Sequence, residues 1–171
     1  AEEIALIVPI SEAVLDDADY DIWGEVRPRL IEAFGQKIDG AILFGQDKPQ
    51  TWRDDVVTTA TSAGGVVTLG SDLYDSILGE GGVIAKVEES SYFVNGHMAD
   101  ITMRAKLRGL KDTTGQPVFK SDMQTGTTYT LDGSPMSFPR NGAFDRSKAL
   151  MISGDFSQLA YSIRQDITFK I

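Results

Sequence analysis

Three aspartates near the start of the chain, Asp17, Asp19 and Asp21, have the spacing of the first three ligands of a calcium-binding loop. Such a loop also needs glycine at its sixth position and glutamate at its twelfth, where this chain carries Ile22 and Pro28. The ring of oxygen ligands would therefore be incomplete. We predict that these carboxylates cap the helix that follows and complement its dipole, and that they bind no metal ion.

A glycine-rich segment, Gly79, Gly81 and Gly82, has the composition of a phosphate-binding loop. A dinucleotide-binding fingerprint would place its third glycine at the position of Ile84, and the chain contains no Gly-Lys-Ser or Gly-Lys-Thr of a P-loop. The segment is therefore predicted to be a flexible turn, with no cofactor bound.

His97 is the only histidine of the chain, so a Ser-His-Asp relay would have to be built on it. The relay would need a nucleophile such as Ser90 or Ser91 beside the imidazole, but no Gly-x-Ser-x-Gly turn is present. We predict that His97 lies at the end of a strand, in a turn formed with Asn95 and Gly96, and has no catalytic role.

Two pairs of adjacent carboxylates, Asp54 with Asp55 and Glu88 with Glu89, could do acid and base chemistry if one member were desolvated. Neighbouring residues on exposed segments are rarely desolvated, and we expect both pairs to be solvated surface. No catalytic residue is therefore predicted.

A basic run, Arg104, Lys106, Arg108 and Lys111, wraps around more than one side of its predicted helix and has no aromatic residues interleaved with it. The chain as a whole carries a net charge of −9, which disfavours nonspecific binding to phosphates. We predict that the run forms ion pairs within or between subunits and does not bind nucleic acid.

Composition indicates one soluble globular unit: 171 residues, 42% hydrophobic and 24% charged. There is no cysteine, which excludes disulfides, thiolate metal sites and a cysteine nucleophile in this chain. The apolar run 4–10 contains Pro9 and is about a third of a membrane span, so no membrane association is predicted.

The elements that would position these residues begin with a strand at 4–10 and a short helix at 12–16. Apolar residues then recur at steps of three and four, which predicts a helix of about 24 residues ending at Gly45. Trp23, Leu30 and Phe34 are expected to anchor it, and Pro28 is expected to kink it or to divide it into two helices.

Beyond Gly45 the periodicity fades, and 46–70 is predicted to be a long excursion with at most short strands or turns. A helix at 71–78 should end at Gly79, and Asp100 should cap a helix that extends to Lys111. The predicted strands are 92–94, 118–119, 127–131, 136–138, 149–153 and 161–171, with a turn at 131–134.

Taken in order along the chain, several short segments resemble the major capsid proteins of tailed bacteriophages. The N-terminal ones are Ile7-Val8-Pro9-Ile10-Ser11-Glu12, Val14-Leu15-Asp16-Asp17, Arg29-Leu30-Ile31-Glu32-Ala33-Phe34, Ile38-Asp39 and Ala41-Ile42-Leu43-Phe44-Gly45. The later ones are Val94-Asn95-Gly96, Leu107-Arg108-Gly109-Leu110-Lys111-Asp112, Gly115-Gln116-Pro117-Val118-Phe119, Leu131-Asp132-Gly133-Ser134-Pro135 and Ser153-Gly154-Asp155-Phe156-Ser157.

The resemblance implies an α+β capsid fold of the Hong Kong phage type. Residues 1–50 would contribute a long spine helix to a peripheral domain, 51–155 would form an axial-like α/β domain, and 156–171 would be the return strand toward the peripheral domain. The N-terminal arm, the extended loop and the last C-terminal strand of such proteins are not recognised in this chain, which we therefore interpret as a fragment.

The function that the resemblance implies is that of a shell subunit, not an enzyme. The full-length protein would assemble as hexamers and pentamers into an icosahedral phage or prophage head, built in the host cytoplasm and enclosing double-stranded DNA without sequence-specific binding. A portal and a scaffold or maturation protease would be its other partners. Two alternatives remain open: an encapsulin shell subunit, which shares the fold, and a metal-assisted hydrolase using Asp17, Asp19 and Asp21.

Overall fold

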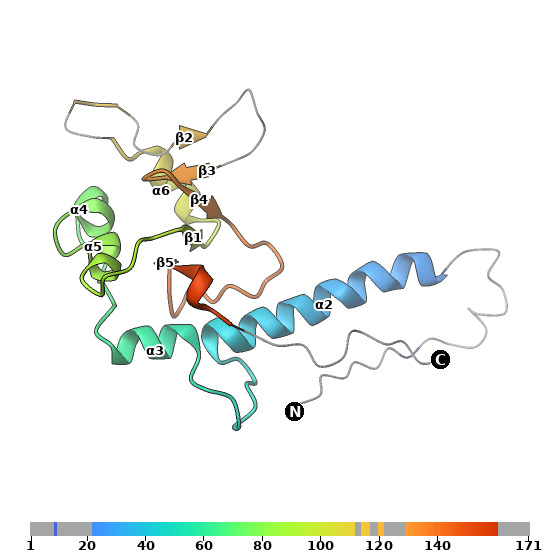
Figure 1. Cartoon of the computed structure of the whole chain (residues 1–171). Helices are drawn as coiled ribbons and strands as arrows, with labels where there is room; N and C mark the ends of the chain where they lie inside the picture. The colour runs from blue at the N-terminus through green and yellow to red at the C-terminus, as the bar shows by residue number, and fades with distance from the viewer. Residues whose placement is uncertain (1–8, 10–21, 112–113, 117–119, 122–128, 161–171) are drawn as a thin grey trace.

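The computed structural model describes Pro9 and residues 22–111, 114–116, 120–121 and 129–160. A long helix, α2, extends away from a lobe that holds a small sheet and several short helices (Figure 1). The lobe combines a mixed sheet with helices, so the predicted α+β class is confirmed. The strands expected at 4–10, 118–119 and 161–171 and the helix expected at 12–16 lie outside the described residues, apart from Pro9.

Helix α2, Ile22–Phe44, is one continuous helix that passes through Pro28, so the alternative of two helices is wrong. It ends where the sequence predicts, because Gly45 adopts a left-handed φ of 67°. The Gly45 amide donates to the Ala41 carbonyl at 3.1 Å, and the Gln46 amide donates to the Gly40 carbonyl at 3.1 Å. The first of these bonds satisfies a carbonyl that the last helical turn would otherwise leave unpaired.

The anchor of α2 is its last turn and not the face that the sequence predicted. Ala41, Leu43 and Phe44 are buried, whereas the side chain of Trp23 is 42% exposed. Leu30 and Phe34 are only half-buried, so the expectation that Trp23, Leu30 and Phe34 anchor the helix is wrong. Helical periodicity identifies an apolar face, but the neighbouring segments decide which part of that face is covered.

Phe44 is completely buried and meets the ring of Phe144 edge to face, with 5.1 Å between ring centroids. The Lys148 ammonium group donates a 2.6 Å hydrogen bond to the Phe44 carbonyl, which places a cation at the negative end of the helix dipole. Asn141 adds a 2.9 Å hydrogen bond to Asp39. The last turns of α2 are therefore joined to the segment 141–148.

A second helix, α3, Val56–Ser62, lies where the sequence predicted only strands or turns. Its residues are mostly Val and Thr, whose low helix propensity concealed it. The decisive signal is Asp55, whose carboxylate accepts a 2.9 Å hydrogen bond from the Thr58 amide as the N-cap. Helix α3 packs beside α2.

The sheet of the lobe has the order β2-β3-β4-β1-β5, in which β1 and β4 are parallel and the other neighbours are antiparallel. The strands are β1 Gly96–Ala99, β2 Lys120–Ser121, β3 Tyr129–Leu131, β4 Ser134–Ser137 and β5 Met151–Gly154. The remaining elements are helices α4 Leu73–Leu78, α5 Val83–Glu88 and α6 Met103–Arg108 and the 3-10 helix η1 Phe156–Gln158.

Most strand predictions are confirmed within two residues, but the strand expected at 92–94 is wrong. Tyr92 and Phe93 are exposed, and the strand begins only at Gly96. The predicted turn at 131–134 joins β3 to β4, with φ of 49° at Asp132 and 77° at Gly133. Two positive φ values in succession define the turn type that fits the twist of a hairpin.

The core of the lobe lies between the sheet and helices α4, α5 and α6. Its buried members are Ile77, Ile84, Ala99, Met103, Leu107, Leu131 and Met136. Helix α6 supplies Met103 and Leu107 from one face. A helix in this region is confirmed, but its N-cap is Thr102 and not Asp100, and it ends at Arg108 and not at Lys111. Among the described residues, no helix has the length and apolar character needed to cross a membrane.

Candidate functional site

Within the part of the chain that the structure describes, the sequence-predicted candidates are not brought together into one site. Asp17, Asp19 and Asp21 lie outside the described residues. Within the described part of the chain, no three His, Cys, Asp or Glu residues are grouped so that they could hold a metal ion.

His97 lies in the middle of the sheet and not in a strand-end turn. It belongs to β1, between β4 and β5, and only 3% of its side chain surface is exposed. Its Nδ1 is 2.9 Å from the Ser153 hydroxyl, and its Nε2 is 3.1 Å from the Leu131 carbonyl. Because a carbonyl only accepts, the Nε2–H donates to Leu131, and neutral Nδ1 accepts from Ser153.

The His97–Ser153 contact connects two strands and is not a relay of the kind the sequence suggested. The partner is the cross-strand neighbour on β5 and neither Ser90 nor Ser91. A backbone carbonyl takes the place that a carboxylate would occupy in a catalytic triad. The histidine therefore joins β1 to the β3–β4 turn and to β5.

Stability should fall as the pH drops below the ordinary His pKa of 6.5. Burial lowers the pKa of His97, against the opposing effects of the Leu131 carbonyl and the Asp132 carboxylate. The unfolded chain then binds the proton more readily than the folded one, so the stabilisation is complete above pH 6.5 and is lost progressively below it. Urea unfolding at about pH 8 and about pH 5 measures this loss.

The variant His97→Gln is the control, since glutamine keeps an amide donor but does not titrate. Its free energy of unfolding should change less between the two pH values than that of the wild type. Equal changes in the two proteins would show that His97 does not cause the pH dependence.

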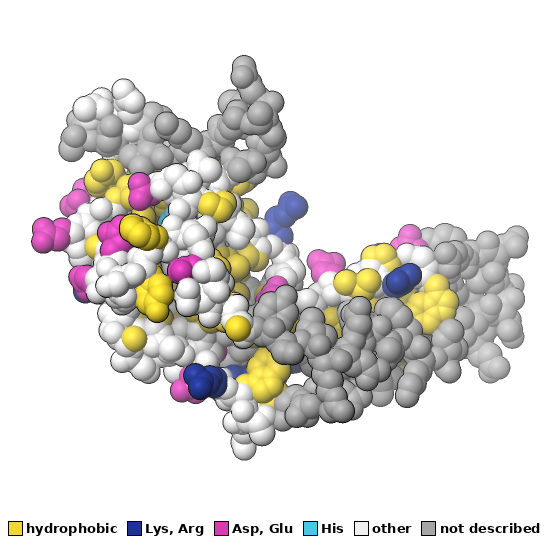
Figure 2. Space-filling view, viewed as in Figure 1, with side chains coloured by type: hydrophobic (Ala, Val, Ile, Leu, Met, Phe, Trp, Pro, Cys, Tyr) yellow, Lys and Arg dark blue, Asp and Glu magenta, His cyan; other side chains and the backbone are white. Residues whose placement is uncertain are grey.

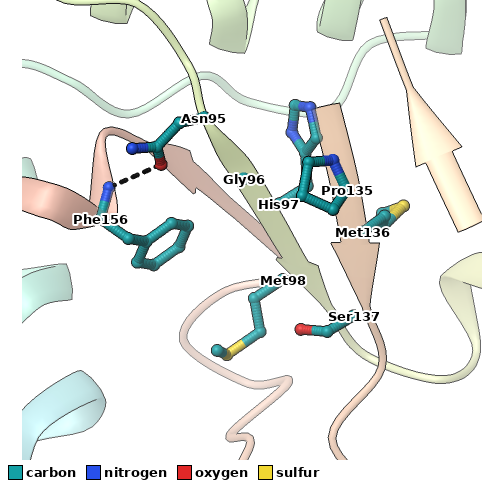
Figure 3. A pocket seen from close by; sticks show the side chains of 8 residues that line it. All are labelled: Asn95, Gly96, His97, Met98, Pro135, Met136, Ser137 and Phe156. Carbon is teal, nitrogen blue, oxygen red and sulfur yellow. Dashed lines mark hydrogen bonds between the residues drawn. The ribbon is translucent and has the colours of Figure 1, made fainter. Parts of the chain in front are cut away.

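A pocket of about 350 Å³ lies beside His97, over β1, β4 and η1 (Figure 3). Its lining includes Met98, Met136, Pro135 and the ring of Phe156, with Ser137 and Asn95 as the other polar side chains. A Cβ on Gly96 would come within 3.0 Å of the Phe156 ring, which explains glycine at this position. Because His97 is held by its two hydrogen bonds, the pocket offers no acid, base or activated nucleophile.

The glycine-rich segment is a tight turn between two short helices. Gly79 ends α4 and Gly82 begins α5, and Gly81 has a φ of 82°. A Cβ on Gly82 would lie 2.9 Å from the backbone oxygens of Asp75 and Gly79. The prediction of a turn is confirmed. Close backbone packing accounts for Gly79 and Gly82, and the positive φ accounts for Gly81.

The two carboxylate pairs differ, and the prediction for Asp55 is wrong. Glu88 and Glu89 are exposed, as predicted, with Glu89 2.8 Å from the Lys86 ammonium group. Asp55 is buried at the start of α3. Burial raises the pKa of this carboxyl, but the hydrogen bonds from Thr58, a hydrogen bond with the Asp55 backbone and the charge of Lys148 together outweigh that effect and leave the pKa below its ordinary value.

Replacing Asp55 with alanine should lower the free energy of unfolding by about 1 to 2 kcal/mol, because α3 loses its N-cap. The matched control is Asp54→Ala. The Asp54 side chain is 74% exposed, and its carboxylate lies a long 3.9 Å from the Lys48 ammonium group. That change should cost less than about 0.5 kcal/mol. Urea unfolding of both variants tests the difference, and equal losses would contradict the capping role.

Among the described residues the basic run forms no ion pair, and its pairing between subunits stays a prediction. The Arg104 guanidinium lies 4.6 Å from the centre of the Tyr129 ring and donates to the Tyr129 hydroxyl. Lys106, Arg108 and Lys111 are exposed, and the ion pairs formed among the described residues include none of the four. Sequence spacing could not reveal an aromatic partner that the fold brings from another strand.

Large apolar side chains are exposed over much of the described surface. They are Trp23, Ile31, Val66, Leu69, Tyr92, Phe93, Ile101 and Leu159. Phe93 is the most exposed of them, at 84%, and it follows Tyr92 in the loop before β1. Single exposed apolar side chains are normal on a protein surface, but Tyr92 and Phe93 are adjacent, and contiguous exposed apolar residues are typical of a surface that contacts another chain.

Comparison with known proteins gives a consistent result. The family model described as Phage capsid family matches residues 1–171. The major capsid protein of Staphylococcus phage 80alpha is 25% identical over 171 residues, which are 100% of this chain and 49% of that protein. This chain thus spans about half the length of that curated relative.

Solved structures from two phages share the fold. A chain from Microbacterium phage Oxtober96 has a TM-score of 0.74 and 36% identity, over 90% of this chain and 51% of that one. A chain from Mycobacterium phage Adephagia has a TM-score of 0.68 and 28% identity, over 89% of this chain and 48% of that one.

Proposed function

This chain belongs to the phage capsid family, and from that premise we propose that it is part of a major capsid protein that self-assembles into an icosahedral shell around double-stranded DNA. The observation that carries the proposal is the family match over all 171 residues. The likeness to solved phage structures and the curated major capsid protein supports the same role. The role is structural and needs no catalytic residue.

The proposed domain organisation follows the shape of the molecule. Residues 1–50 contribute α2 to a peripheral domain, 51–155 form an axial-like α/β domain, and 156–171 return toward the peripheral domain. Support comes from α2, which extends away from the lobe and is joined to it near Phe44 (Figure 1). Hexamers and pentamers of such subunits would form the shell, with a portal and a scaffold or maturation protease as further partners in the host cytoplasm.

Electron microscopy of the complete gene product that contains residues 1–171 tests the proposal. Expression in a bacterial host should give closed isometric particles of uniform size. A protein that stays monomeric at every concentration and salt condition tried would contradict a shell function.

The contents of the particles separate the phage shell from an encapsulin. A phage shell made with its packaging machinery should protect DNA from nuclease, whereas an encapsulin should contain a cargo protein. The phage matches favour the first outcome. Nuclease protection and mass spectrometry of purified particles distinguish the two.

A further inference from the structure

Acidic and basic side chains are sharply separated along the lobe. From Ser71 to Phe93 the chain has five acidic residues and a single base, Lys86. The next part, from Met103 to Lys111, has four basic residues and no acidic one. The fold therefore presents an acidic surface on one group of elements and a basic surface on another.

The acidic surface, here called the acidic edge, is formed by α4, α5 and the loop that follows α5. Figure 2 shows Asp and Glu side chains gathered over α4 and α5. Its exposed members are Asp72, Asp75, Glu80, Glu88 and Glu89, together with Tyr92 and Phe93. Two exposed aromatic rings beside a cluster of carboxylates combine an apolar anchor with a charged surround, as a protein interface does.

The basic surface, here called the α6 face, consists of exposed Lys106, Arg108 and Lys111, with exposed Ile101 at the start of the same segment. No ion pair within the described residues neutralises these three bases. Exposed bases thus lie on more than one side of the α6 segment, and no described carboxylate forms an ion pair with them, in a chain whose net charge is −9.

We infer that the acidic edge of one subunit docks on the α6 face of a neighbouring copy. This inference rests on the proposed self-assembly and identifies one contact within it. Complementary charge on two different surfaces of one chain gives a head-to-tail contact, and head-to-tail contacts generate rings when the rotation closes. Phe93 supplies the apolar anchor, and Glu88 and Glu89 face the bases of the neighbour.

Charge reversal in the complete gene product tests the contact. Glu88→Lys with Glu89→Lys, and separately Lys106→Glu with Arg108→Glu, should each reduce the yield of particles by about tenfold or more, because like charges would meet. The fourfold variant, whose net charge equals that of the wild type, should recover assembly. Particles that form normally in both double variants would overturn the inference.

Disulfide trapping provides a second test, because residues 1–171 contain no cysteine. Phe93→Cys and Arg108→Cys subunits, coassembled and oxidised, should give cross-linked dimers that neither variant gives alone. Val66→Cys, also exposed, replaces Phe93→Cys in the control and should give none. Dimers from Phe93→Cys alone would instead indicate that the same surface meets itself.

The outcomes separate this contact from the proposed function and from nucleic-acid binding. If the wild type forms particles, the cysteine pair gives no cross-link and charge reversal has no effect, the contact is refuted but the shell function stands. Absence of particles in the wild type would reject the shell function itself. Lys106→Glu with Arg108→Glu particles that assemble normally but lose DNA would show that the α6 face contacts nucleic acid, and would overturn the inference.

Discussion

Replacing Phe44 with alanine should lower the free energy of unfolding by about 3 to 5 kcal/mol. The ring is completely buried and meets Phe144 edge to face, so its removal loses apolar burial and leaves a cavity. Phe44 also occupies the turn of α2 that Lys148 holds, so the loss falls on the junction between helix and lobe. Urea unfolding followed by circular dichroism measures the effect.

Phe93→Ala is the matched control, because it removes the same ring from an 84% exposed position. It should change the stability of the unassembled chain by no more than about 0.5 kcal/mol. Phe34→Ala, at a half-buried position, should fall between the two. If Phe34→Ala lowered the free energy of unfolding more than Phe44→Ala, the sequence-based prediction that Phe34 anchors α2 would be right after all.

The second large effect is expected at Leu107. Replacing it with alanine should lower the free energy of unfolding by about 2 to 5 kcal/mol. The Leu107 side chain is fully buried in the core that α6 shares with the sheet. Leu69→Ala removes the same atoms from a 38% exposed position and should cost far less. If the two variants have the same free energy of unfolding, α6 does not contribute to the core of the lobe.

The features that the sequence predicted well depend on local chemistry. Gly45 ends α2 because only a residue tolerant of positive φ fits there, and Asp132-Gly133 forms the hairpin turn for the same reason. Each is decided by a few adjacent residues. Helix α2 was predictable because its apolar period runs through six turns.

The features that the sequence missed depend on partners distant along the chain. Asp55 looks like a surface carboxylate until α3 folds onto the end of α2 and buries it. His97 gains its role from Leu131 and Ser153, neither of which is near it in sequence. No periodicity encodes such contacts.

The surface proposed for assembly could not be predicted, because its aromatic segment has a sequence that suits either a buried strand or an exposed loop. Tyr92-Phe93-Val94 has the composition of a buried strand, and only the backbone shows that the strand begins at Gly96 and leaves Phe93 in solvent. The clustering of bases near α6 was visible in the sequence, but their exposure and their lack of partners among the described residues were not.

The position of β1 between β4 and β5 also sets an order for folding. Both of its partners follow it along the chain, and His97 pairs with Met136 on one side and Ser153 on the other. During synthesis β1 therefore leaves the ribosome before both strands with which it pairs. The β3–β4 hairpin can form earlier than the β1–β5 pair, because its two strands are neighbours in the sequence. Closing the loop that separates His97 from Ser153 by 56 positions costs chain entropy, so we expect β5 to join the sheet after the β3–β4 hairpin has formed. Until then β1 has an unpaired edge and His97 lacks its serine, and an unpaired strand edge is a site at which chains aggregate.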